Sequence, residues 1–262
     1  MRKGLGVVLV AVCLLGLGAA AAERPASVFV IHCEPTTADS AMWLTLVDLI
    51  ESATAHNVPA TILFTAQWAR MVLDDEARID QLNAWIANGH EIGCHHHGYW
   101  GTKNRGAQWD GYTNTPVEDL DPADRSSYLG TMDDYMAILG ALPGERRTGC
   151  LGTDEGDAID WPCDLDYATA GHAVEHATST PSTVLYGACS FTEIGHGLLI
   201  SPPRGSMVAA YEACSVDAVF GTVIHVYNVA ELPMACEAWF DHLVSVDPNG
   251  ERRFTVSGLL DS

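Results

Sequence analysis

Basic residues are scarce in this chain of 262 residues, which carries 13 Lys and Arg against 34 Asp and Glu. The formal net charge of −21 at pH 7 repels phosphate backbones and anionic lipid headgroups, so we expect no nucleic-acid partner. Charged residues make up only 18% of the chain and hydrophobic residues 48%, which is enough apolar surface to bury a large core. That composition excludes an intrinsically disordered protein.

Long hydrophobic runs are absent beyond residue 22. None reaches the roughly 18 to 20 apolar residues that a membrane-spanning helix needs, so we expect no transmembrane segment in the mature chain. Residues 1–22 have the pattern of a secretion signal peptide, with a basic start at Arg2 and Lys3, an apolar stretch, and small residues before the expected cleavage site. We therefore predict a secreted or periplasmic protein.

The C-x-x-C spacing is also absent, so neither a zinc ribbon nor a thioredoxin-like redox site is supported. Seven cysteines follow the predicted signal peptide, and this odd number leaves at least one of them outside any disulfide. Four of the seven fall between Cys163 and Cys236. Because exported proteins can form disulfides, we predict one or two bridges in this later half, with the connectivity open.

No internal repeat, low-complexity tract or Ser/Gly linker interrupts residues 23–262, so we predict a single domain. Short apolar runs alternate with segments of helical periodicity, which predicts parallel strands joined by right-handed helical crossovers. A pattern of this kind and length favours a barrel-like α/β fold over an open sheet. Strands are expected at 27–33, 59–65, 90–97, 183–188, 197–201 and 219–227, and helices at 41–56, 75–88, 122–142 and 235–246.

Polar residues that bind metals gather where the predicted strands end, which is where parallel α/β folds place their active sites. Alternate side chains of a strand share a face, so His32 lies with Glu34, and His95 lies with His97 but not with His96. Two imidazoles and one carboxylate are a common ligand set for zinc or another divalent metal, with positions left open for water and substrate. Such a metal suits the hydrolysis of an amide or ester.

Several of these features also have structural interpretations. The histidine triplet could be a solvated cluster, and His32 or His225 could be a buried histidine satisfied by hydrogen bonds. The loop 98–114 contains Trp100, Trp109, Asp110 and Tyr112, which could stack on sugar rings or simply pin down the loop. The acidic run 154–160 lacks the EF-hand spacing, so we expect a solvated loop rather than a calcium site.

Five segments, in chain order, have the character of a known family. They are VFVIHCEP, VPATILFT, NGHEIGCHHHGYW, RRTGCLG and FGTVIHVYN. The sequence resembles the NodB-like polysaccharide deacetylases of carbohydrate esterase family 4, well over residues 28–100 and weakly beyond Arg147. The resemblance implies a distorted (β/α) barrel and a divalent metal, expected to be zinc, held by an aspartate and two histidines. It also implies an aspartate that acts as base and a late-strand histidine that acts as acid.

Carried onto this sequence, the resemblance implies that Glu34 replaces the ligand aspartate and that His95 is the first ligand histidine. The family spaces its two histidines as H-x-x-x-H, but Tyr99 occupies the last of these positions here. Strand alternation therefore favours His97 as the second ligand, with His96 as the alternative.

The catalytic assignments also follow from the resemblance. His225 corresponds to the late-strand acid, and Arg147 to an arginine that orients the site. The family's paired aspartates on the first strand are replaced by His32-Cys33-Glu34, so His32, which shares a face with Glu34, becomes the candidate base.

These observations predict an exported, metal-dependent hydrolase that removes acetyl groups from an N- or O-acetylated polysaccharide or oligosaccharide. Two alternatives stay open. One is a catalytically inactive protein of the same fold that binds glycan or metal, because the aspartate pair is missing. The other is a related metal hydrolase that acts on a non-sugar amide.

Overall fold

The computed structural model describes residues 24–105, 108–152, 155–200, 205–232 and 234–262. The predicted signal peptide, residues 1–22, lies outside the described residues. Within the described ranges, no helix combines the length and the apolar character that crossing a membrane requires.

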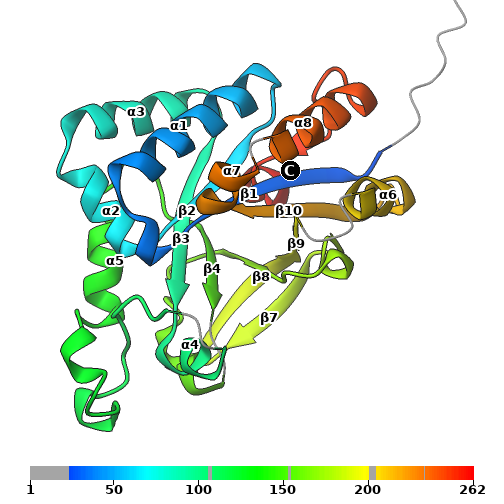
Figure 1. The fold of residues 1–262 in the computed structure, drawn as a ribbon. Helices are drawn as coiled ribbons and strands as arrows, with labels where there is room; N and C mark the ends of the chain where they lie inside the picture. The colour runs from blue at the N-terminus through cyan, green and yellow to red at the C-terminus, as the bar shows by residue number, and fades with distance from the viewer. Residues whose placement is uncertain (1–23, 106–107, 153–154, 201–204, 233) are drawn as a thin grey trace, which may run out of the picture.

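One sheet runs through the described chain (Figure 1). Its strands are β1 (Ala26–Cys33), β2 (Ala60–Phe64), β3 (Glu91–His97), β4 (Thr148–Gly152), β5 (Tyr167–Ala170), β6 (Thr178–Ser179), β7 (Ser182–Tyr186), β8 (Cys189–Gly195), β9 (Gly197–Leu198), β10 (Val219–His225) and β11 (Arg253–Phe254). The main path is β6-β10-β1-β2-β3-β4-β5-β8-β7, in which only the two outermost pairings are antiparallel. The parallel core predicted from the alternating pattern is therefore confirmed.

The two ends of the parallel core meet at His196. β8 pairs with β5 up to Gly195, the backbone N–H of His196 donates to the Ala170 carbonyl, and β9 then pairs with β10. The strands approach closely here, because a Cβ on Gly221 of β10 would overlap the carbonyl oxygen of Gly195. The sheet thus curls into the distorted barrel that the sequence predicts.

The helices are α1 (Ser40–Ala55), α2 (Ala66–Leu73), α3 (Glu76–Ala87), α4 (Tyr99–Arg105), α5 (Met132–Gly140), α6 (Gly205–Ala213), α7 (Val226–Glu231), α8 (Met234–Val246) and α9 (Val256–Leu260). The expected helices 41–56, 75–88 and 235–246 agree with α1, α3 and α8 within a residue or so at each end. The expected helix 122–142 is wrong in its first half. A capping box between Thr131 and Asp134 starts α5 only at Met132.

Side chains of β1 alternate between two apolar environments. Phe29, Ile31 and Cys33 pack in the large cluster between the sheet and its helices, whereas Val28 and Val30 pack inside the barrel. The inward-facing series continues with His32 and then Glu34, so the polar residues of β1 lie above an apolar barrel interior. This alternation positions the site described below.

One disulfide, Cys163–Cys189, joins the segment before β5 to the first residue of β8. The predicted bridge in the later half of the chain is therefore present. It ties the start of β8 to the segment that precedes β5.

Candidate metal centre at the barrel mouth

Glu34, His95 and His97 meet at the carboxyl ends of β1 and β3. The Nε2 atom of His95 lies 3.1 Å from Oε1 of Glu34, and Nε2 of His97 lies 2.9 Å from Oε2 of the same carboxylate. The two Nε2 atoms are 3.0 Å apart. Ligands about 2.1 Å from one metal ion lie roughly 3.0 to 3.4 Å from each other, so the three side chains are spaced as a metal centre requires.

Backbone carbonyls fix the tautomers of both histidines. Nδ1 of His95 lies 2.8 Å from the Cys150 carbonyl oxygen, and Nδ1 of His97 lies 2.9 Å from that of Gln108. A carbonyl only accepts, so each Nδ1 carries the proton and each Nε2 presents a lone pair to Glu34. Three acceptors then face one another at about 3 Å, and such an arrangement is stable only around a cation, either a proton or a metal ion.

The electrostatics agree with this interpretation. Burial raises the pKa of Glu34, but the charge and hydrogen bond of His95, together with those of His97, lower it well below its usual value. Burial lowers the pKa of His97, but the Glu34 carboxylate, together with the Gln108 carbonyl and Asp110, raises it by more. The site therefore holds an ionised carboxylate and attracts positive charge.

His225 joins the same cluster from the end of β10. Its Nε2 lies 3.3 Å from Oε1 of Glu34, and its Nδ1 donates to Oδ1 of Asn228 at 3.1 Å, so the lone pair faces Glu34. The ring of Tyr227 stacks on the imidazole, with 5.1 Å between centroids. Burial lowers the pKa of His225 to about 4, although Glu34 opposes this, so the ring is neutral at neutral pH.

His32 lies beneath this cluster rather than within reach of solvent. Its ring stacks on that of His95, with 4.1 Å between centroids, and is edge-on to His196 and His225. Burial, followed by the charges of neighbouring histidines, holds its pKa well below the usual value. The structure brings His32 to the site but packs its ring against the ligand histidine.

Sequence reasoning missed His196, His172 and Cys150. His196 sits between two glycines at the seam of the barrel, Cys150 of β4 pairs in register with His95, and the ring of His172 lies 5.8 Å from that of His225. The glycine–histidine–glycine sequence is an unusual pattern for a strand and could have drawn attention to His196. Nothing in the local sequence indicates that Cys150 of β4 lies beside His95 of β3 and His32 of β1.

His96 points away from the metal centre, as strand alternation predicts. Its Nδ1 lies 2.8 Å from Asp110, its Nε2 lies 3.8 Å from Asp160, and all three side chains are fully buried. Burial lowers the pKa of His96, but the two carboxylates raise it to about 10, so the ring is a buried imidazolium. His96 therefore has a structural role.

The expectation of a solvated acidic loop at 154–160 is wrong for two of its residues. Asp157 is buried and accepts from the backbone N–H groups of Trp100 and Gly101, which begin α4. Asp160 is buried and accepts from Asn114. These carboxylates fasten the loop after β3 to the segment after β4. Asp154 lies outside the described residues.

The aromatic loop is largely held by its own contacts. Nε1 of Trp109 donates to the Tyr112 carbonyl, Tyr112 is completely buried, and the ring of Tyr99 lies edge-on to those of Trp100 and Trp109. Of the two interpretations offered for this loop, the structure supports the one in which its own aromatic side chains hold the loop in place.

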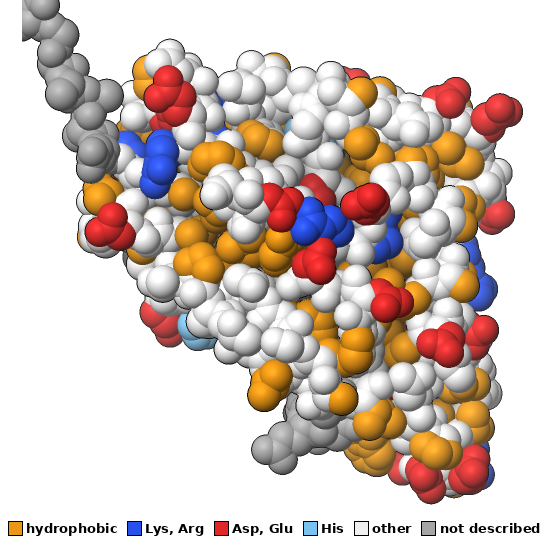
Figure 2. All heavy atoms as spheres, turned by 180° about the vertical axis from the view of Figure 1, so that it is seen from behind, with side chains coloured by type: hydrophobic (Ala, Val, Ile, Leu, Met, Phe, Trp, Pro, Cys, Tyr) orange, Lys and Arg blue, Asp and Glu red, His pale blue; other side chains and the backbone are white. Residues whose placement is uncertain are grey.

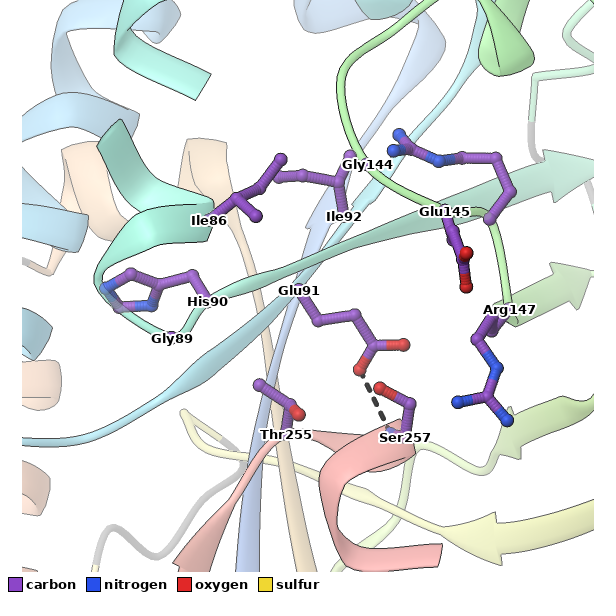
Figure 3. Close-up of a pocket in the computed structure, with 11 residues that line it drawn as sticks. Ile86, Gly89, His90, Glu91, Ile92, Gly144, Glu145, Arg147, Thr255 and Ser257 are labelled. Carbon is purple, nitrogen blue, oxygen red and sulfur yellow. Dashed lines mark hydrogen bonds between the residues drawn. The ribbon is translucent and has the colours of Figure 1, made fainter. Parts of the chain in front are cut away.

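Arg147 is not brought to the metal centre. It precedes β4, at the opposite end of the barrel from His95, and its guanidinium forms ion pairs with Asp166 and Asp261. Figure 3 shows it beside Glu91, which accepts a hydrogen bond from the backbone of Ser257 in α9. The physical reason is register. Arg147 lies three residues before Cys150, the partner of His95, which is about 10 Å along a strand.

No protein-family profile matches the sequence, and no curated protein matches it. Solved structures do match. A protein described as a polysaccharide deacetylase from Mycobacterium smegmatis superposes with a TM-score of 0.54 at 11% identity over 91% of this chain and 90% of its own. A 4-alpha-glucanotransferase from Thermococcus litoralis gives 0.52 at 14% identity, over 92% of this chain but 40% of that longer one. Peptidoglycan deacetylase PdaC from Bacillus subtilis gives 0.47 at 12% identity, covering 91% of each chain.

The chain therefore has the distorted α/β barrel fold of that polysaccharide deacetylase. The resemblance read from the sequence is confirmed at the level of the fold. A glucanotransferase shares the barrel to a similar degree, so the fold alone does not determine the reaction. That depends on the residues at the barrel mouth.

Proposed function

We propose that this protein is an exported, metal-dependent hydrolase that removes acetyl groups from an N- or O-acetylated carbohydrate. The observation that carries the proposal is the convergence of the His95 and His97 Nε2 lone pairs on the buried carboxylate of Glu34. The donor set of two imidazoles and one carboxylate fits zinc and leaves coordination positions for water and substrate. The fold shared with deacetylases supports the choice of acetylated sugars.

Glu34, His95 and His97 would hold the metal. When bound there, the ion would polarise the acetyl carbonyl and increase the acidity of water at the site. The carbonyls of Cys150 and Gln108 keep each ligand ring in the correct tautomer. Glu34 supplies the charge that offsets the cation.

His225 would accept the proton of the attacking water and then return it to the leaving group. Its Nε2 lone pair faces the same carboxylate, and the ring is neutral at neutral pH, so it can accept a proton as water attacks the acetyl carbon. When the carbon–nitrogen or carbon–oxygen bond breaks, the same imidazolium can return that proton to the leaving sugar atom, and acetate departs. Asn228 keeps Nε2 directed at the site throughout.

The proposal gives no proton-transfer role to His32 or Arg147. Nε2 of His32 is fully buried beneath His95, and Arg147 is engaged by two aspartates at the far end of the strands. Arg147 was expected to orient the site from the resemblance, and His32 was expected to act as base because it shares a strand face with Glu34. Geometry favours His225 as the single residue that accepts and then returns the proton.

The test is an assay of the mature chain, about residues 23–262, loaded with zinc. Acetate release should be measured in parallel on chitin-type oligosaccharides, peptidoglycan fragments and acetylated xylan. We expect release from at least one substrate, abolished by a chelator and restored by zinc. The variant His97→Ala should lose activity and the zinc held at the mouth together, whereas the half-buried His56, the residue that follows α1, provides a matched control, His56→Ala, that keeps both.

Release from none of the substrates by the fully loaded chain would overturn the deacetylase assignment. Tight binding of the same oligosaccharides without turnover would then indicate a glycan-binding protein that uses this fold. Turnover of simple acetylated amines alone would indicate a hydrolase of non-sugar amides.

A further inference from the structure

Directly beneath Glu34, the barrel interior contains a second group of metal-binding side chains. His32 of β1, Cys150 of β4 and His196 of the seam are all buried, and each offers one ligand atom within 4.8 Å of the other two. Val28, Val30 and Val223 lie deeper in the same interior. The three polar groups therefore form a layer between the apolar floor of the barrel and the mouth.

Three ring nitrogens of the two histidines in this layer are buried without a hydrogen bond of good geometry. Within the described part of the chain, these are Nε2 of His32 and both ring nitrogens of His196, whose ring interacts with the backbone of Gly171. A neutral imidazole has one donor and one acceptor, and burying such a group without hydrogen bonds is unfavourable. Three such ring nitrogens in an otherwise apolar interior point to a missing electrophilic partner.

The chemistry of the donors identifies that partner. A thiol and two imidazoles are soft or borderline ligands, which favour zinc over magnesium, calcium or manganese. A metal ion would accept a lone pair from each imidazole and displace the thiol proton. The thiolate of Cys150 would offset part of the charge of a divalent cation bound here.

We propose that His32, Cys150 and His196 form a second zinc site, buried beneath the centre at the mouth. Cys150 connects the two sites: its side chain would bind the inner ion, while its carbonyl fixes the ring of the outer ligand His95. The stacked rings of His32 and His95 then place one ligand of each ion in contact. By fixing the positions of Cys150, His32 and His196, the inner ion would stabilise the outer ligand His95 and the seam of the barrel.

The test is metal stoichiometry of the mature chain, stripped with a chelator and reloaded with zinc. We expect two zinc ions per chain in the wild type and one in Cys150→Ser, which removes the soft ligand but keeps the backbone carbonyl that orients His95. Glu34→Gln should also retain one. Cys33 lies one residue from Glu34 but packs toward the helices, so Cys33→Ala is the matched control and should retain two.

Cobalt provides a second measurement that does not depend on activity. A thiolate bound to cobalt gives a charge-transfer band in the near ultraviolet, which should appear in the wild type and in Glu34→Gln. It should vanish in Cys150→Ser, on β4, and in His196→Gln, between β8 and β9. Circular dichroism of each variant checks that the fold is kept.

The outcomes separate this inference from the proposed function. One zinc per chain that is lost in Glu34→Gln and kept in Cys150→Ser, with no thiolate band, would overturn the inner site and leave the outer one standing. One zinc that is lost in Cys150→Ser and kept in Glu34→Gln would support the inner site and overturn the ligand set proposed for catalysis.

Discussion

At the scale of single residues, the carboxylate of Glu34 organises the mouth of the barrel. Three imidazoles, those of His95, His97 and His225, each direct Nε2 at one of its oxygens. The side chain is only 11% exposed, so these interactions are poorly screened by solvent. Changes to the charge of this one residue, or to the lone pairs around it, should therefore have large and distinct effects.

Glu34→Gln should abolish metal binding at the mouth while the fold survives. The amide has nearly the same shape but no charge to offset the cation, so we expect zinc affinity at that site to fall by more than the roughly hundredfold that changes around a ligand produce. Competition with a chromogenic chelator measures the affinity. The exposed Glu251 supplies the control, Glu251→Gln, and equal affinity in the two variants would contradict the assignment.

His225→Ala should separate catalysis from metal binding. Loss of a general acid–base typically lowers the rate about 10²- to 10⁴-fold, and we expect that drop in kcat with zinc content unchanged. Steady-state kinetics on the best substrate, with metal analysis of the same sample, gives both quantities. A rate equal to that of His56→Ala would remove His225 from the mechanism.

At the scale of elements, β3 shows how one strand serves two purposes. His95 and His97 point into the barrel, whereas His96 points between the sheet and the loop after β3, where it meets Asp110 and Asp160. The same three-histidine sequence thus provides two candidate metal ligands and one buried ion pair. The ion pair ties β3 to the loop that carries Gln108, whose carbonyl orients His97.

His96→Ala should destabilise the protein rather than act directly on the metal. It leaves two buried carboxylates without a counter-charge, and the loss of one partner from a buried pair typically costs about 3 to 5 kcal/mol. The free energy of unfolding in urea measures this. A stability equal to wild type would show that Asp110 and Asp160 are already protonated or solvated.

The same residue predicts a pH dependence on the alkaline side. The folded pKa of His96 is raised to about 10, above the unfolded value of about 6.5. Its contribution to stability is therefore fully present below about pH 6.5 and is lost as pH rises toward 10. Urea unfolding across this range should show the decline in the wild type and a smaller one in His96→Gln.

At the scale of the whole molecule, acidic side chains are spread over the surface (Figure 2), whereas many histidines are buried. Asp and Glu outnumber Lys and Arg, 34 to 13, and acidic side chains are spread over the face in Figure 2 between apolar patches. Six of the eleven histidines are instead buried, most of them near the mouth of the barrel or in and next to β3. His90, for example, accepts from the backbone of Ala60 and contacts Thr54.

This distribution predicts loss of stability in mild acid. Burial lowers the pKa of His90 and His225 to about 4 and that of His196 to about 3, so the unfolded chain binds more protons than the folded chain below about pH 6.5. We expect the free energy of unfolding of the metal-free chain to fall by about 3 kcal/mol or more between pH 6.5 and pH 4. A flat profile would contradict it, and His90→Gln should decline less steeply.

Local features of the sequence determined the parts of this protein that depend on backbone geometry. The apolar runs gave the strands that carry Glu34, His95 and His225, and the two-residue period of a strand separated His95 and His97 from His96. That period is a property of any extended backbone, so it needs no knowledge of the neighbours. The same local reasoning failed where turn chemistry decided the outcome, as at the start of α5.

Only the tertiary structure decided which side chains meet across strands. Cys150 and His196 reach His32 through strand register and closure of the barrel, and Arg147 is carried to the opposite end by that same register. The burial of Asp157 and Asp160 likewise depends on a loop more than 40 residues away. Such contacts depend on the packing of the whole core, which the spacing of residues in one segment does not encode.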